Sequence, residues 1–149
     1  MEVSLIKIFT MGFTKKNAEQ FFSLLKKNGV RKIIDIRLNN HSQLAGFTKG
    51  EDLKYFLKEI AGIEYAHELD FAPTKELLKK YQNKEISWSD YEAEFNQILE
   101  TRMKNRKIDP NAYNQSCFLC SEPAPEKCHR RLVAEYLKVI IKDIEVIHL

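Results

Sequence analysis

Short apolar runs rich in β-branched and aromatic residues alternate along this chain with longer amphipathic segments. This alternation predicts strands at about 3–10, 30–36, 63–67, 116–120 and 144–148. The spacing of apolar residues predicts helices at about 15–28, 48–61, 73–81, 89–103 and 125–139. Strands that alternate with helices are typical of α/β folds. We therefore predict a three-layer α/β fold, with a mainly parallel sheet of about 4–5 strands and helices on both faces.

Local signals indicate where several of these helices begin and end. Thr14 is suited to cap the first helix, and Asn28-Gly29 to stop it. Thr48-Lys-Gly-Glu51 and Ser89-Asp-Tyr-Glu92 each have the pattern of a capping box at a helix start. Pro73 is suited to the first turn of the next helix.

Length and composition limit the classes of protein that the chain can represent. Its 149 residues are enough for one domain, so we expect a single α/β domain over 1–149. A net charge of +3 is too small to indicate nucleic-acid binding by itself. No apolar run is long enough to span a bilayer, so we expect no membrane partner.

The cysteines indicate a compartment. The chain has three, an odd number, and its first residues resemble a strand more than a secretory signal. We therefore expect a reducing cytoplasmic location and no disulfide framework. The sequence names no cofactor and no oligomeric state.

Polar residues follow several predicted strands at their carboxyl ends, where parallel sheets bind ligands. Thr10 and Gly12 follow the first strand, at a turn that can serve either as a plain cap or as an anion site. Asp35 and Arg37 follow the second strand and share one face of it. They form either a structural ion pair or a grip on a phosphate or carboxylate. The loop after them offers further polar ligands: Asn39, Asn40, His41 and Ser42.

The segment from Cys120 to Arg130 carries most of the reactive groups. Cys117 and Cys120 have zinc-ligand spacing, but residues three apart on a strand point to opposite faces, so Cys117 is better explained as a core residue. We expect Cys120 and Cys128 to lie near each other. A thiol at a helix start is activated as a nucleophile, or it simply packs inward. The C-x5-R cradle of cysteine phosphatases is absent.

The polar residues next to these cysteines can also be explained in more than one way. His129 is a candidate acid or base, or a cap of the preceding loop. Glu122 is a candidate general base, or an orienting group for His129 or Arg130. Arg130 is a candidate anion ligand. Trp88, Tyr91 and Phe95 have helical spacing and are most simply core or interface residues, with base stacking as the alternative.

Taken together, these motifs resemble the bacterial and archaeal domain-of-unknown-function 488 family, over about 8–137. The resemblance is carried by Thr10-Met-Gly12-Phe-Thr14, Asp35-Ile-Arg37, Ser42, Phe47, Gly62-Ile-Glu-Tyr65, Cys120-x-Glu122 and Cys128-His129-Arg130. Thr14 stands where members usually have Ser. Leu69 is followed by Asp70 and Phe71, where members often have Leu-Gly-Gly, and Cys117 is not part of the pattern. The resemblance implies where a site lies, and the family name assigns no reaction.

Three functions are consistent with the sequence. The first is binding of a small anionic molecule, phosphate- or nucleotide-like, with a cysteine–histidine site for chemistry. Its ligand-binding residues would be Thr10, Gly12, Asp35, Arg37, Ser42 and Arg130, and its catalytic residues Cys128, His129, Cys120 and Glu122. The second is a nucleic-acid-binding or nucleic-acid-processing module. The third is a metal-stabilised interaction domain that uses Cys117, Cys120, Cys128 and His129.

Overall fold

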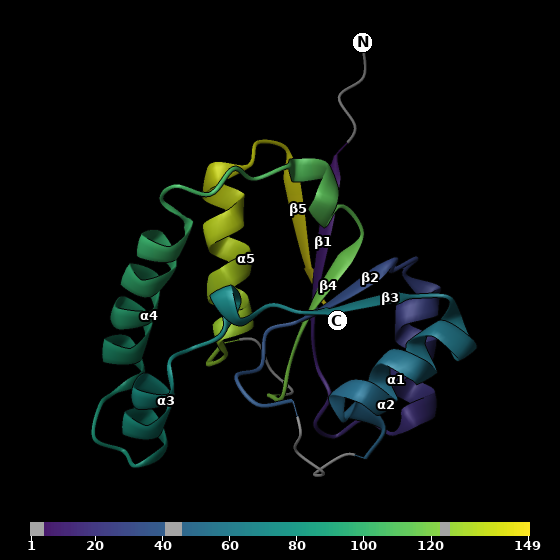
Figure 1. Cartoon of the computed structure of the whole chain (residues 1–149), viewed down its shortest axis with the longest axis horizontal. Helices are drawn as coiled ribbons and strands as arrows, with labels where there is room; N and C mark the ends of the chain where they lie inside the picture. Colours follow the sequence, from purple (N-terminus) through teal and green to yellow (C-terminus); the bar gives the residue numbers. More distant parts are fainter. Residues whose placement is uncertain (1–4, 41–45, 123–125) are drawn as a thin grey trace.

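The computed structural model describes residues 5–40, 46–122 and 126–149. Its five strands form one parallel sheet in the order β3-β2-β4-β1-β5 (Figure 1). The strands are β1 (Ile6–Gly12), β2 (Lys32–Asp35), β3 (Glu64–His67), β4 (Ser116–Cys120) and β5 (Ile144–His148). The predicted α/β fold with a mainly parallel sheet is therefore confirmed.

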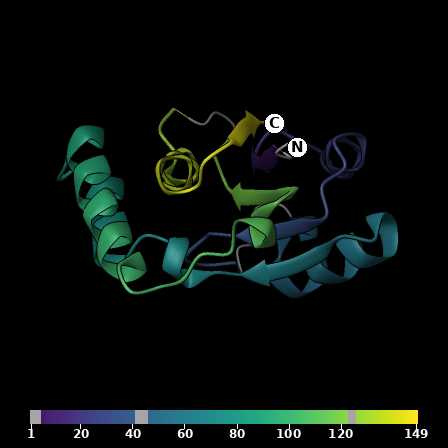
Figure 2. The same cartoon turned by 90° about the horizontal axis from the view of Figure 1, so that it is seen from above.

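Helices cover both faces of this sheet, as the sequence predicts (Figures 1 and 2). One face carries α1 (Ala18–Lys27) and α2 (Gly50–Phe56), which continues as a π-helical turn over Leu57–Ala61. The other face carries α3 (Lys75–Gln82), α4 (Trp88–Met103) and α5 (His129–Ile140). Short 3₁₀ turns complete the chain at Gly46–Thr48, Leu69–Phe71 and Pro110–Tyr113. Within the described residues, no helix combines the length and apolar character needed to cross a membrane.

The central strand β4 is buried along its whole length. Its side chains alternate between two hydrophobic clusters, one on each face of the sheet. Phe118 and Cys120 pack toward α4 and α5, whereas Cys117 and Leu119 pack toward α1. A strand covered on both faces is expected to be apolar at every position, which explains the run Ser-Cys-Phe-Leu-Cys.

The helix that follows β4 lies on the opposite face of the sheet from the helices that follow its two neighbouring strands. The helices after β1 and β2 lie on one face, and α5, which follows β4, lies on the other. Because β4 lies between β1 and β2, its carboxyl end is a topological switch point, where open α/β sheets bind ligands. Two backbone hydrogen bonds extend the pairing beyond the strands, from Phe13 N to Cys120 O (3.2 Å) and from Thr14 N to Ser121 O (3.1 Å).

Several predicted helix starts are wrong, and each error has a local cause. Thr14 does not cap α1, because its hydroxyl donates to the carbonyl of Ser121. Asn17 is the cap instead, in a capping box with Gln20. The Asn28-Gly29 stop is confirmed, with Gly29 at φ +69°.

The later helices shift in the same way. Ser87, and not Ser89, caps α4 in a capping box with Asp90. Thr74 caps α3, so Pro73 lies just before that helix rather than in its first turn. Helix α2 begins after Lys49 without a side-chain cap, so the predicted box at 48–51 is wrong.

Two further differences concern the ends of elements. Strand β1 runs to Gly12, two residues beyond the predicted end, because its pairing with β4 continues to Cys120. Helix α5 begins at His129 and not at 125. The predicted strand residues 3–4, the loop residues His41 and Ser42, and Pro125 lie outside the described residues.

The first residue of α2 lies against a polar side chain in the loop after β2. Gly50 N donates to the carbonyl of Asn40 (2.8 Å), and a Cβ on Gly50 would lie 2.9 Å from Asn40 Cγ. Asn40 is held in turn by a hydrogen bond to Tyr65 (3.0 Å). Only a residue without a side chain fits at this close approach.

The substitution Gly50→Ala therefore tests this contact. We expect a loss of about 1 kcal/mol in the free energy of unfolding, because overpacking outweighs the better helix propensity of alanine. Urea denaturation measures it. Gly46→Ala is the matched control, because a Cβ there meets nothing within 4 Å. Equal effects of the two substitutions would contradict the account.

Candidate functional site

A buried ion pair lies at the carboxyl end of β2. Asp35 accepts two hydrogen bonds from the Arg37 guanidinium, from Nε to Oδ1 (2.8 Å) and from Nη2 to Oδ2 (2.7 Å). Asp35 is completely buried and Arg37 is 4% exposed. Arg37 Nη2 also donates to the carbonyl of Thr48 (2.6 Å), and the guanidinium carbon lies 5.2 Å from the centre of the Phe13 ring. These contacts fix the guanidinium in one orientation.

One nitrogen of this guanidinium takes no part in these hydrogen bonds. Arg37 Nη1 is buried and has no hydrogen-bond partner among the described residues. A buried donor without a partner costs on the order of 1–3 kcal/mol. Such a group in a native structure requires an explanation, and a bound ligand is one.

The segment that carries Asp35 and Arg37 is held by three rings from neighbouring elements. Tyr65 on β3 donates to Asp35 Oδ2 (2.6 Å). His67 Nε2 donates to the carbonyl of Arg37 (2.6 Å), and His129 Nε2 donates to the carbonyl of Ile36 (2.7 Å). Burial and the Asp35 carboxylate raise the pKa of Tyr65, so its phenol stays protonated as a donor.

His129 is a neutral imidazole in this arrangement. Burial lowers its pKa to about 4, and the hydrogen bond to Ile36 opposes that shift only in part. The Phe95 ring meets the imidazole edge-on, with centroids 5.6 Å apart. Because Nε2 must carry the proton donated to Ile36, Nδ1 is the nitrogen that can accept one.

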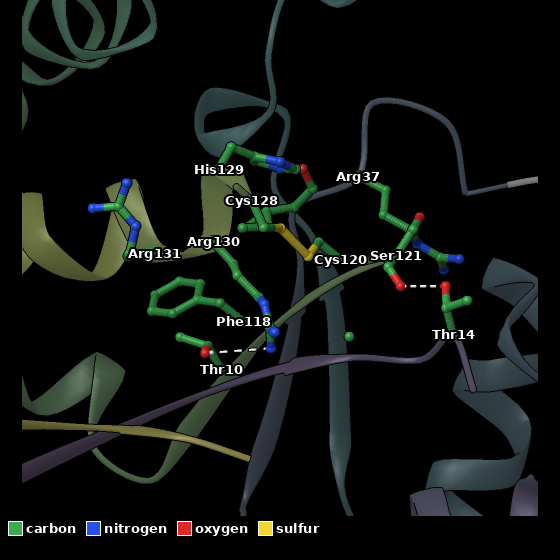
Figure 3. The surroundings of a disulfide bond; sticks show 12 residues. Thr10, Thr14, Arg37, Phe118, Cys120, Ser121, Cys128, His129, Arg130 and Arg131 are labelled. Atoms are coloured by element: carbon green, nitrogen blue, oxygen red, sulfur yellow. Dashed lines mark hydrogen bonds between the residues drawn. A yellow bond between two sulfur atoms is a disulfide. The ribbon is translucent and has the colours of Figure 1, made fainter. Parts of the chain in front are cut away.

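The structure joins Cys120 and Cys128 in a disulfide across the loop that connects β4 to α5 (Figure 3). The prediction that these two residues lie close together is confirmed. The sequence predicts no disulfide framework, and the structure has this one disulfide. The odd cysteine count does not determine which cysteines the fold brings together, and Cys117 remains as the free one.

Cys117 is separated from this pair by the sheet. It is fully buried in the cluster on the α1 face, and burial raises the pKa of its thiol to about 12. Across the described residues, no three His, Cys, Asp or Glu side chains gather as a metal site would require. The hypothesis of a metal held by Cys117, Cys120, Cys128 and His129 thus gains no support from the geometry.

Arg130 runs inward from α5, away from the loop. Its side chain is completely buried, and Nη1 lies 3.5 Å from Thr10 Oγ1 (Figure 3). Thr10 Oγ1 is also 2.5 Å from His148 Nδ1 on β5. Thr10 and Arg130 therefore link β1, α5 and β5 beneath the strand ends.

A cavity of about 250 Å³ opens between the carboxyl ends of β2 and β4 and the helices α3 and α4. Its polar side is formed by Arg37, Ser121, Glu122, Lys127 and His129, with the Cys120–Cys128 pair between them. Its apolar side is formed by Pro73, Leu78, Tyr81, Trp88 and Tyr91. The Trp88 and Tyr91 rings are stacked, with centroids 4.9 Å apart.

The structure divides the residues selected from the sequence into two groups. Those that line the cavity are Arg37, Cys120, Glu122, Cys128 and His129. Those that lie behind its wall and support it are Thr10, Gly12, Asp35 and Arg130. The carbonyl of Gly12 accepts a hydrogen bond from Lys16 Nζ (2.8 Å). Ser42, the remaining candidate, lies outside the described residues.

Sequence reasoning missed the aromatic side of the cavity. Trp88 and Tyr91 were explained as core or interface residues, because their helical spacing is the same for either role. Tyr65 was missed as the partner of Asp35. No sequence signal could have found this pairing, because it depends on β3 lying next to β2, and strand order is not contained in local sequence patterns.

The domain of unknown function DUF488 matches residues 17–137, and the chain belongs to this family. No curated protein and no solved structure matched the chain. The family assigns no activity, so the function has to be argued from the site itself.

The buried ion pair gives a prediction for stability. Asp35→Asn leaves the Arg37 guanidinium buried without its counter-charge, which should cost about 3–5 kcal/mol. Asp70→Asn is the matched control, because Asp70 is 53% exposed in its pair with Arg106 and should cost less than about 1 kcal/mol. Urea unfolding of both variants provides the comparison. Similar losses would show that the Asp35–Arg37 pair is not a buried charge pair.

His129 gives a prediction for pH. Its pKa is lowered in the folded chain, so the unfolded chain binds more protons between pH 6.5 and 4. The stabilisation is complete above pH 6.5 and is lost as pH falls toward 4, by about 3 kcal/mol in total.

The measurement is the free energy of unfolding across this pH range. His129→Gln keeps a donor for the Ile36 carbonyl but does not titrate, so its pH dependence should be flatter by that amount. Since His148 is retained in the variant, the difference isolates His129. Parallel pH profiles would refute the assignment.

Proposed function

We propose that this protein binds a small anionic molecule in the cavity between the strand ends and α3–α4. The observation that supports it most is the buried Nη1 of Arg37, a residue of the cavity lining, which has no hydrogen-bond partner among the described residues. A carboxylate or phosphate oxygen would supply the missing acceptor in a charge-assisted hydrogen bond. Because Nη1 is closed off from solvent, the ligand group would have to displace part of the wall that covers it.

The rest of the lining suits a ligand with two parts. Lys127 adds a second cation near the mouth, and His129 stays neutral and adds no charge. Opposite them, Trp88 and Tyr91 offer a flat apolar surface for a ring or chain. A volume of about 250 Å³ is small for such a pocket and favours a metabolite over a polymer.

A nucleic-acid partner receives less support. The charged side chains described in the lining are Arg37, Lys127 and Glu122, which do not form the basic stripe that a polyphosphate backbone requires. Whether the bound molecule is also transformed depends on the Cys120–Cys128 pair and His129.

Trp88 is the single tryptophan of the chain and lines the cavity, so its fluorescence reports occupancy. Titration with inorganic phosphate and with adenosine monophosphate should give a saturable change, with a Kd between about 1 μM and 1 mM. Uncharged adenosine should give none. Arg37→Lys should weaken binding at least about tenfold, because lysine lacks the planar fork.

The matched control is Arg106→Lys, which alters an exposed arginine that is not part of this cavity. It should leave the affinity unchanged. Absence of a saturable change with either anion, or equal losses in the two arginine variants, would contradict the proposed function.

A further inference from the structure

We propose that Cys120 and Cys128 form a reactive dithiol–disulfide couple, and that its substrates are anionic thiols of low molecular weight. This inference rests on the proposed function, because the same cavity that recognises the anion leads to the sulfur atoms. It adds a reaction class and a substrate class to that site.

The position of the two cysteines supports this reaction. Both cysteines line the cavity together with Arg37, Lys127 and Glu122, so an anion bound in this cavity would lie beside the sulfur pair. The two residues are eight apart in sequence and connect the end of β4 to the start of α5. Cys117 lies on the other face of the sheet and cannot exchange with them.

Only small molecules can reach the two sulfur atoms. Cys120 is 1% exposed and Cys128 is 3% exposed. Thiols carried on folded proteins cannot approach sulfur atoms buried to this degree, whereas a small thiol can enter the cavity. The cations in its lining then favour small thiols that carry a carboxylate, sulfonate or phosphate group.

The two sulfur atoms differ in their surroundings, and therefore in how well each can leave as a thiolate. Cys128 is the N-cap of α5, a helix of twelve residues, and its side chain makes no capping hydrogen bond. The dipole of a helix N-terminus stabilises a thiolate there. Cys120 ends a buried strand and has no such stabilisation. Cys128 is therefore the better leaving group.

The reaction follows from this asymmetry. The thiolate of the substrate forms a bond to Cys120 Sγ, the Cys120–Cys128 bond breaks, and its electron pair stays on Cys128 Sγ. A second substrate thiolate then attacks the substrate sulfur of the mixed disulfide, and the Cys120 sulfur leaves and is protonated. Two thiols are oxidised to one small disulfide, and the protein disulfide is reduced to two thiols.

The test compares three small thiols that differ in charge. The oxidised chain is treated with 2-mercaptoethanesulfonate, 2-mercaptoethanol or cysteamine, quenched with N-ethylmaleimide, and its intact mass is recorded over time. Rates are divided by the thiolate concentration of each reagent, because thiolate is the reacting species. We expect the anionic thiol to react about tenfold faster per thiolate than the neutral one, and the cationic thiol to be slowest.

Variants assign the effect to the cavity. Lys127→Gln, an exposed position in the lining, should reduce the preference for the anionic thiol. Cys117→Ser should change no rate. Cys128→Ser has no disulfide to reduce, so it should consume none of the three thiols. When this variant is given the symmetrical disulfide of 2-mercaptoethanesulfonate, the Cys120 thiolate should displace one 2-mercaptoethanesulfonate and keep the other in a mixed disulfide, because no neighbouring thiol remains to release it. Inorganic phosphate should slow the anionic thiol and not the neutral one.

The outcomes separate the two proposals. No reduction by any thiol overturns the reactive couple, and equal rates per thiolate overturn the substrate class. Either result can occur while phosphate still changes Trp88 fluorescence, which leaves the proposed function intact. If phosphate neither changes that fluorescence nor slows the anionic thiol, the proposed function fails as well.

Discussion

The rest of the site depends on the buried ion pair between the Asp35 carboxylate and the Arg37 guanidinium. The carboxylate is completely buried, and both of its oxygens accept hydrogen bonds from the Arg37 guanidinium, while Tyr65 donates to one of them. A buried charge is tolerated only when such partners are present. These contacts use Nε and Nη2 of Arg37 and leave Nη1 without a hydrogen-bond partner among the described residues. The pair therefore stabilises the end of β2, and Nη1 is the donor that we propose for the ligand.

The topology brings Arg37 and the sulfur pair into the lining of one cavity. Strand β4 lies between β1 and β2 but sends its helix to the opposite face, so the loop after β4 opens the cavity toward α3 and α4. His129 at the start of α5 donates to the backbone between Asp35 and Arg37. One hydrogen bond thereby connects the helix that carries Cys128 to the segment that carries the guanidinium. Anion recognition and thiol chemistry would therefore share one rigid frame.

Local sequence patterns predicted the parts of this structure that depend on local order. The strands at 116–120 and 144–148, the opposite directions of Cys117 and Cys120, and the position of Arg37 at a strand end all follow from alternation and periodicity. The pairing of Asp35 with Tyr65 and the aromatic wall from α4 depend on which elements become neighbours in space. The caps of α1 and α4 lie a few residues from the predicted Thr14 and Ser89. Asn17 and Ser87 accept hydrogen bonds from the first-turn amides instead, and local patterns do not distinguish between neighbouring candidates of this kind.

The most direct test of the central claim is crystallographic. Crystals soaked in selenate and measured at the selenium absorption edge locate a bound oxyanion by its anomalous signal. The account predicts a peak in the cavity, with an oxygen within hydrogen-bonding distance of Arg37 Nη1, and no peak there in Arg37→Lys. A selenate bound only elsewhere on the protein, with Nη1 still lacking a partner, would contradict the claim that the Asp35–Arg37 pair presents a donor to an anionic ligand.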